Sequence, residues 1–180
     1  MLKNTVSSYG LISKLFHWLI GIAIIGLLVI GFTMVSILPS TDKWQLYAMH
    51  KATGVVVLFF VLLRFLWRFI NIKLELPSDL PLWQKLASKI THYLLYIFMF
   101  LMPVSGILMS RFGGHEINVF NLFIIPPLEK NIILARFFNN LHEVSAFLFA
   151  ALIGLHISAG LYHHFIRKDN ILSRMIKSNK

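Results

Sequence analysis

Four apolar segments dominate the pattern of hydrophobic and polar positions along this chain. They cover residues 15–38, 47–70, 90–110 and 138–165. A helix needs about 20 apolar residues to cross the hydrocarbon core of a bilayer, so each segment predicts one membrane-spanning helix. The sequence therefore predicts an all-α fold, an integral membrane four-helix bundle that forms a single domain over residues 1–180.

The polar stretches between these segments predict three connections of different character. Residues 39–46 form a short polar turn, and residues 71–89 form an exposed loop with a short amphipathic stretch over 82–86. The longest connection, residues 111–136, contains an apolar run over 119–125. That run is too short to span a bilayer, and we expect it at the membrane interface.

The distribution of Lys and Arg predicts how the bundle is oriented. Of the 17 Lys and Arg residues, 12 lie at the N-terminus, around the second connection or in the C-terminal tail: Lys3, Lys14, Arg64, Arg68, Lys73, Lys85, Lys89, Arg167, Lys168, Arg174, Lys177 and Lys180. The other five lie on the opposite side: Lys43, Lys51, Arg111, Lys130 and Arg136. Because basic residues collect on the cytoplasmic side of a membrane, we expect both termini in the cytoplasm.

Composition supports a membrane protein and removes several alternatives. The chain is 57% hydrophobic and only 13% charged, against about 25% charged residues in an average soluble domain. The net charge of +10 comes from residues at the ends of the apolar segments, which argues against a nucleic-acid partner. The chain has no cysteine, which excludes cysteine-ligated iron–sulfur clusters, covalently attached haem of the C-x-x-C-H type and disulfides.

Four histidines lie inside the apolar segments, and each is followed four residues later by a small residue. The pairs are His17 with Gly21, His50 with Gly54, His142 with Ala146 and His156 with Gly160. A polar ring is costly in hydrocarbon and usually marks a functional site, and a small residue at i+4 leaves space beside the ring. Four such imidazoles meet the requirement of two buried bis-histidine haems. The alternative is structural: a lone histidine can hydrogen-bond across helices, and glycines can permit close helix packing.

Depth in the membrane sorts these histidines into two pairs. His142 and His156 are 14 residues apart, which is roughly 21 Å of helical rise and brings both rings close to one helix face. The fourth segment can therefore offer one ligand to each of two stacked cofactors. We expect His50 to pair with His142 on the exoplasmic side and His17 with His156 on the cytoplasmic side. Zinc needs three or four converging ligands, which two separated pairs do not provide.

Other polar residues are weaker candidates for contact with a cofactor. Arg64 is a candidate partner for the propionates of the cytoplasmic haem, although it can equally snorkel to the interface. Lys51, next to His50, is the equivalent candidate on the other side. His163 could reach a propionate or a quinone head group. His92 has Tyr96 at i+4, which would crowd a porphyrin, and we expect it to be structural.

Several short motifs resemble those of one family, the bacterial cytochrome b561 family of small di-haem membrane proteins, which includes superoxide oxidase. The resemblance covers nearly the whole chain. The motifs are KLFHW over 14–18, MHKATG over 49–54, PVSG over 103–106, LHE over 141–143, GLH over 154–156, and His163-His164 followed by KDNILSRM over 168–175.

The resemblance implies a bacterial inner-membrane protein with two haem b groups and His17, His50, His142 and His156 as axial ligands. It also implies electron exchange with quinone, with ubiquinone as the acceptor. In the superoxide oxidase branch, superoxide on the periplasmic side gives its electron through haem to ubiquinone, a superoxide:quinone oxidoreductase activity. Lys51 and Arg111 are then the candidate residues for steering an anion, because a positive field attracts one.

Two other functions remain open from the sequence. The chain could be the electron-transfer membrane subunit of a larger quinone-linked dehydrogenase, with a protein as electron donor. It could also be a cofactor-free membrane protein that packs against a partner or regulates it.

Overall fold

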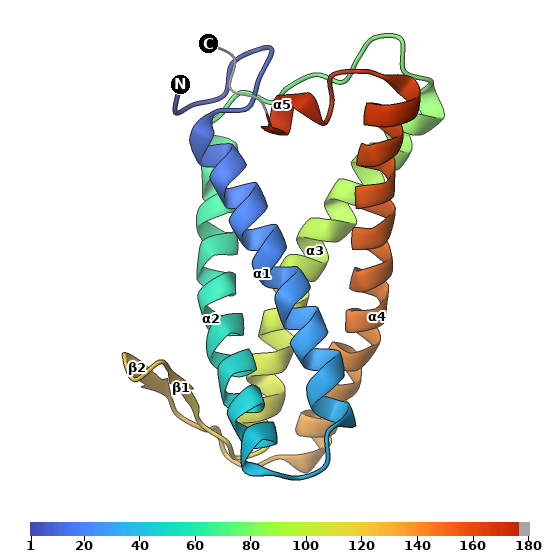
Figure 1. The fold of residues 1–180 in the computed structure, drawn as a ribbon. Coiled ribbons are helices and arrows are strands. Elements are labelled where there is room, and N and C mark those ends of the chain that lie inside the picture. Colours follow the sequence, from blue (N-terminus) through green and yellow to red (C-terminus); the bar gives the residue numbers. More distant parts are fainter. Residues whose placement is uncertain (177–180) are drawn as a thin grey trace.

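Four long helices form the body of the molecule (Figure 1). The structure is a computed structural model, and it describes residues 1–176. The helices are α1 (Leu11–Ser36), α2 (Thr41–Phe69), α3 (Leu82–Phe112) and α4 (Ile132–Tyr162). All four, α4 together with the turn that follows it, are long and apolar enough to cross a membrane. The predicted membrane four-helix bundle is confirmed.

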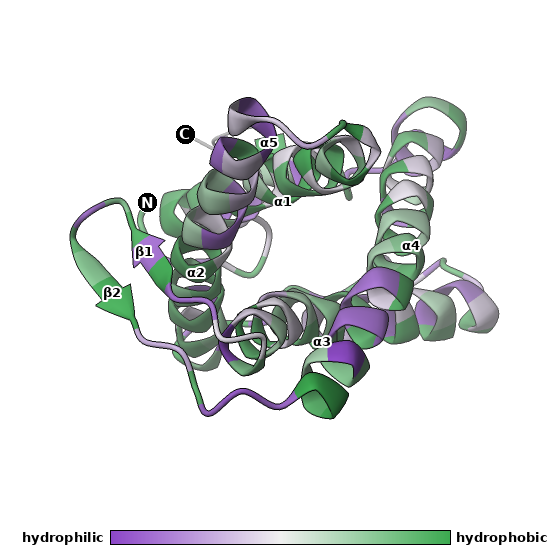
Figure 2. Ribbon diagram, turned by 90° about the horizontal axis from the view of Figure 1, so that it is seen from below, coloured by the Kyte–Doolittle hydropathy of each residue, from purple (hydrophilic) through white to green (hydrophobic). Residues whose placement is uncertain are grey.

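The helices run alternately up and down and pack as neighbours in chain order. Close contacts join α1 to α2, α2 to α3 and, most extensively, α3 to α4, whereas α4 has few or no close backbone contacts with α1 and α2. Seen along the bundle, the four helices surround a central region (Figure 2). The N-terminus and the short helix α5 (Ser173–Ile176) lie at one end, here called the termini end. The opposite end, which carries the α1–α2 turn, is called the hairpin end.

The helices begin earlier than the apolar segments predict. Ser40 caps α2, with its Oγ accepting a hydrogen bond of 3.2 Å from the Lys43 backbone N–H. Asn131 caps α4 in the same way, with its side-chain oxygen accepting from two backbone N–H groups at 3.1 Å. The predicted amphipathic stretch 82–86 is the first part of α3. Apolarity marks only the part of a helix inside hydrocarbon, and caps extend each helix into the polar interface.

The connection between α3 and α4 contains a β-hairpin that the sequence did not predict. Strand β1 (Ile117–Val119) pairs antiparallel with β2 (Phe123–Ile125), in the register Ile117 with Ile125. The turn between them places Phe120 and Asn121 at positive φ, 51° and 60°. The apolar run 119–125 therefore comprises the end of β1, the turn and β2.

The centre of the bundle is an apolar cluster that lies between the two ends. Its buried members are Ile20, Ile24, Val57, Val61, Met99 and Phe149. Phe98 stacks on Phe149 with ring centroids 5.8 Å apart. This cluster lies between the termini-end half and the hairpin-end half of the interior, and each half contains one pair of histidines.

Candidate functional site: two histidine pairs

The four histidines inside the membrane segments meet as two pairs. His17 of α1 faces His156 of α4 at the termini end, with ring centroids 6.0 Å apart. His50 of α2 faces His142 of α4 at the hairpin end, with ring centroids 6.2 Å apart. These are the pairings expected from depth, and α4 contributes one ring to each. The two rings of a pair are steeply inclined to each other, at 71° and 82°.

The separations within each pair fit two imidazoles on one metal ion. An imidazole nitrogen binds a metal at roughly 2.0 Å, and this nitrogen lies roughly 1.1 Å from the centroid of its ring. The ring centroids of two imidazoles on opposite sides of one metal ion are therefore roughly 6.2 Å apart. The observed 6.0 and 6.2 Å match this value. Among residues 1–176, no group of three or more His, Cys, Asp or Glu side chains could hold a metal ion. Two-ligand axial sites are thus the metal chemistry that these histidines fit.

Hydrogen bonds from α3 orient His142 at the hairpin end. Its Nδ1 lies 2.9 Å from the backbone oxygen of Met102 and 3.1 Å from Oγ of Ser105, a side chain with 0% exposure. A carbonyl oxygen only accepts hydrogen bonds, so Nδ1 carries the proton and Nε2 keeps its lone pair. A hydrogen bond of this kind fixes the tautomer that a metal-binding histidine needs.

Two glycines on neighbouring helices make room for the rings at the hairpin end. A Cβ atom on Gly106 of α3 would lie 3.1 Å from Cε1 of His142, and one on Gly31 of α1 would lie 3.3 Å from Cε1 of His50. Side chains at these positions would push against the rings. Gly106 belongs to the PVSG motif over 103–106, but neither glycine was predicted as a ring neighbour, because spacing along one helix does not identify neighbours on another helix.

An apolar cavity of about 50 Å³ adjoins this pair. His50, His142 and Gly54 line it together with apolar side chains, including Met99 and Phe149. A Cβ atom on Gly54 would meet nothing within 4 Å, and the same holds for Gly21 and Gly160 near the other pair. The glycines that the sequence singled out therefore lie beside open space. Nδ1 of His50 is buried without a hydrogen-bond partner among the described residues, so this nitrogen is not committed to another protein group.

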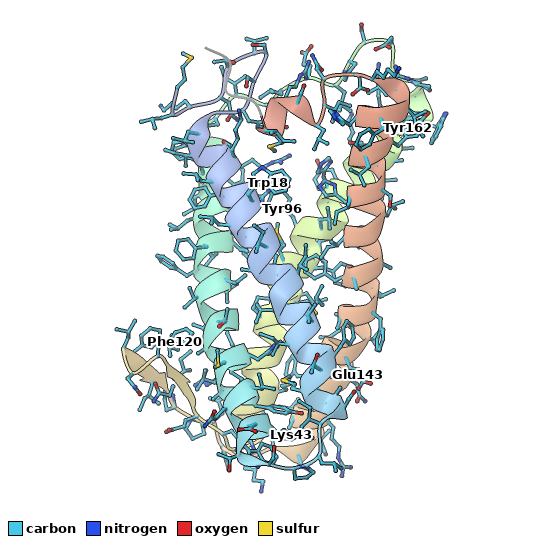
Figure 3. All side chains as sticks on the ribbon, viewed as in Figure 1. Trp18, Lys43, Tyr96, Phe120, Glu143 and Tyr162 are labelled. Carbon is cyan, nitrogen blue, oxygen red and sulfur yellow. The ribbon has the colours of Figure 1, made fainter. Side chains whose placement is uncertain are left out.

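The termini-end pair has a different, cationic environment. The Arg64 guanidinium Nη2 lies 3.1 Å from Nδ1 of His17. The guanidinium groups of Arg64 and Arg68 both lie over the ring of Tyr96, at 5.8 and 5.1 Å from its centroid. Figure 3 shows Tyr96 and Trp18 at this end of the bundle.

Outside the membrane segments, burial raises the pKa of Tyr9 against the opposing effect of nearby arginines, so its hydroxyl stays protonated.

His92 also lies beside this pair, a position that the sequence did not predict. Its ring centroid lies 5.6 Å from that of His156, closer than the ring of His17. Its Nδ1 donates a 2.7 Å hydrogen bond to the Ser88 backbone oxygen, one turn earlier on α3. The bond ties the ring to its own helix, which fits a supporting position beside the pair.

His163 lies apart from the pair, in the turn that ends α4. Residues His163–Arg167 form a π-helix, and Lys168 follows in the left-handed conformation at φ 57°. Nδ1 of His163 lies 2.6 Å from Asp169, and Arg167 lies 2.5 Å from Asp79 in the α2–α3 loop. The contact with Asp169 therefore holds His163 against the segment that follows α4.

The two candidate anion-steering residues lie at the hairpin end and hold the α3–α4 connection. Nζ of Lys51 donates to Oγ of Ser110 at 3.4 Å and to the Glu116 backbone oxygen at 3.3 Å. Nε of Arg111 donates to the Pro126 backbone oxygen at 2.9 Å. Lys51 follows His50 on α2, and its ammonium binds the start of the α3–α4 connection.

Four membrane-spanning helices with two facing histidine pairs in an apolar interior define the class of membrane b-type cytochromes. Comparison with known proteins agrees, because the family model described as prokaryotic cytochrome b561 matches residues 8–178. The chain belongs to this family. It is therefore a multi-pass protein of the bacterial inner membrane that binds haem b and transfers electrons.

Curated relatives cover most of the chain. Cytochrome b561 homolog 2 of Escherichia coli K12 is 37% identical over 96% of this chain and 93% of its own length. Cytochrome b561 homolog 1 of the same organism is 33% identical over 56% of this chain and 57% of its own length. A probable superoxide oxidase, CybB of Yersinia pestis, is 25% identical over 91% of this chain and 93% of its own length.

Proposed function

We propose that this cytochrome holds two haem b groups and moves single electrons between a donor at the hairpin end and quinone at the termini end. The observation that carries the proposal is the pair of ring separations, 6.0 and 6.2 Å, each matching two axial ligands on one iron. His17 and His156 would ligate one haem, and His50 and His142 the other. Ligation of each haem by two imidazoles would suit electron transfer rather than oxygen binding.

Haem supplies a one-electron redox centre, and the protein supplies position and insulation. Met102 and Ser105 hold His142 in the tautomer that leaves Nε2 free. Gly31, Gly54 and Gly106 keep space around the hairpin-end rings. The apolar cluster between the pairs excludes water from the path between the two redox centres.

We assign the termini end to the cytoplasm and the hairpin end to the periplasm. The bias of 12 against five basic residues supports this orientation, and the N-terminus and α5 lie at one end of the bundle (Figure 1). Electrons would then enter from a periplasmic donor and leave to ubiquinone near the cytoplasmic face.

Superoxide is the donor that we propose. The relative named probable superoxide oxidase gives the precedent within the family, and Lys51 next to His50 supplies a cation where an anion would deliver its electron. Two superoxide anions would each lose one electron and leave as dioxygen. One ubiquinone would take both electrons and two protons to become ubiquinol.

The first test is the oxidised and dithionite-reduced absorption spectrum of the purified protein, with its haem-to-protein ratio. Two low-spin b haems per chain are expected, and one haem or none would contradict the proposed pairs. The second test supplies superoxide enzymatically and measures ubiquinone reduction by the protein alone. Ubiquinone reduction by this protein in the absence of a partner protein would support a stand-alone enzyme. A protein that holds two haems but shows no such activity would refute superoxide as the donor.

A further inference from the structure

The β-hairpin slants outward beside α2, with its tip directed from the hairpin end back toward the middle of the bundle's length (Figure 1). Its base lies against α2, where Lys51 binds the Glu116 backbone oxygen. Lys51 is ten residues beyond the start of α2 at Thr41, which is roughly 15 Å along the helix axis. In Figure 3, Phe120 at the hairpin tip lies outside the bundle, and along the bundle axis it is farther from the hairpin end than Lys43. The tip is therefore level with the apolar part of α2.

The two strands of the hairpin have different surroundings. Ile117 and Val119 of β1 are each only 1% exposed, and β1 packs against α2. Four residues of the turn and β2 are all large, apolar and at least half exposed: Phe120, Leu122, Phe123 and Ile124. Ile124 is paired with Asn118 and so lies on the face opposite to Ile117 and Val119. Figure 2 shows the hairpin outside the ring of helices, beside α2, with β2 coloured as hydrophobic.

The polar groups of the hairpin are arranged for an environment poor in water. The side-chain amide of Asn118 donates to Oδ1 of Asn121 at 2.8 Å, and the Asn121 backbone N–H donates to Oδ1 of Asn118 at 2.8 Å. No charged residue occurs over residues 117–128, whereas Glu116, Glu129 and Lys130 flank this stretch. A short uncharged segment between charged flanks suits a position at the boundary between headgroups and acyl chains.

We propose that Phe120, Leu122, Phe123 and Ile124 insert into the lipid leaflet at the hairpin end, making the hairpin a shallow membrane anchor. Lipid is the occupant because the tip lies level with a membrane-spanning part of α2 and projects away from the bundle. A depth of roughly 5–10 Å, typical of interfacial elements, leaves the free backbone groups of the two strand edges within reach of water and headgroups.

The anchor also bears on the hairpin-end pair. The base of the hairpin supplies the backbone oxygen that Lys51 binds, and Lys51 follows His50 in α2. Lipid contact at the tip would therefore hold the loop that positions this cation.

Site-specific fluorescence tests the insertion directly, and the absence of cysteine makes single labelling clean. An environment-sensitive fluorophore is attached to Leu122→Cys in protein reconstituted into phosphatidylethanolamine and phosphatidylglycerol vesicles. Some lipids carry bromine near the headgroup end or near the tail end of the acyl chain. Glu129→Cys, on the charged flank, is the aqueous control, and Phe59→Cys, on the exposed side of α2, is the deep control.

The Leu122 label should emit at shorter wavelength than the Glu129 label and be quenched most by bromine near the headgroup end. Emission like that of the Glu129 label would overturn the proposal. So would a blue shift that disappears when each vesicle holds at most one chain, because a second copy would then cover the tip. A blue shift seen in native membranes but absent from vesicles would point to a protein partner and would equally overturn it.

A charge on the outer face should remove the insertion. With the label at position 122, Ile124→Asp should reduce quenching to about half or less, because a carboxylate resists transfer to the acyl-chain boundary. Leu38→Asp is the matched control, since Leu38 is an 83% exposed apolar residue in the α1–α2 turn at the same end. It should leave quenching unchanged. Unaltered quenching in Ile124→Asp, with helix content retained by circular dichroism, would contradict the anchor.

Discussion

The two histidine pairs have nearly equal ring separations, yet their hydrogen bonds run in opposite directions. At the hairpin end, His142 donates from Nδ1 to the Met102 backbone oxygen. At the termini end, His17 must accept at Nδ1, because the Arg64 guanidinium can only donate. A neutral imidazole that accepts at Nδ1 carries its proton on Nε2.

The difference shows that one site is already prepared for a metal and the other is not. Nε2 of His142 presents a lone pair as the chain stands. Ligation by Nε2 of His17 requires the proton to move to Nδ1, which breaks the bond to Arg64. The released guanidinium then becomes available for a carboxylate, which is the role that the sequence analysis gave to Arg64 toward a haem propionate.

Removing one ligand from each pair should have the largest effect. His142→Ala and His156→Ala should each lower the haem content from two to one per chain, because iron loses an axial ligand. Pyridine haemochrome analysis against protein concentration measures this ratio. His92→Ala is the control and should retain both haems, and loss of one would give His92 a ligand's role.

Filling the cavity at the hairpin end should remove one haem and leave the other. Gly54→Leu places a side chain in the space lined by His50 and His142, so the termini-end haem alone should remain. Gly26→Leu is matched, since a Cβ atom there also meets nothing within 4 Å and Gly26 does not line the cavity. Equal haem loss in both variants would mean that helix packing, and not the cavity, responds.

The charge next to His50 should matter for an anionic donor and not for haem content. Lys51→Gln should lower superoxide-driven ubiquinone reduction by roughly three- to tenfold at low salt, with a smaller effect at high salt. Lys43→Gln, at the same end, is the comparison; Nζ of Lys43 binds the Ile37 backbone oxygen. Equal rates in the two variants would separate Lys51 from the donor site.

The cation at the termini end should raise the reduction potential of that haem. Arg64→Gln should lower it by roughly 40–80 mV, because a nearby positive charge favours the reduced state. Arg68→Gln, one turn further along α2, should lower it less. A spectroelectrochemical titration resolves the two haems, and a shift confined to the hairpin-end haem would reverse the assignment.

The hydroxyl of Ser105 should have the smallest effect. Ser105→Ala removes one acceptor from Nδ1 of His142 and leaves the Met102 oxygen, so the ligand becomes slightly less basic. The hairpin-end potential should rise by roughly 10–40 mV. No change, or an equal change at both haems, would show that the hydroxyl does not act through the ring.

The four helices and the two histidine pairs could be predicted from the sequence, because both depend on the positions of residues along the chain. Segment length predicted four spans, and helical rise placed His142 and His156 at two depths. The neighbours that shape each site come from other helices, and periodicity within one helix cannot identify them. Gly31, Gly106 and Ser105 were missed as ring neighbours for this reason, as was His92 beside His156. The hairpin was missed because its strands are only three residues long.

Each histidine pair joins α4 to a helix with which it has few close backbone contacts, α1 at one end and α2 at the other. Backbone packing is strongest between α3 and α4, so side chains bridge those two junctions, for example Phe32 of α1 and Phe147 of α4. A ligand that bridges both rings of a pair would therefore be a structural member as well as a redox centre. Binding only the assembled form, it would shift the folding equilibrium by mass action. The cellular supply of haem would then set how much of the newly inserted chain matures and how much is left to proteolysis.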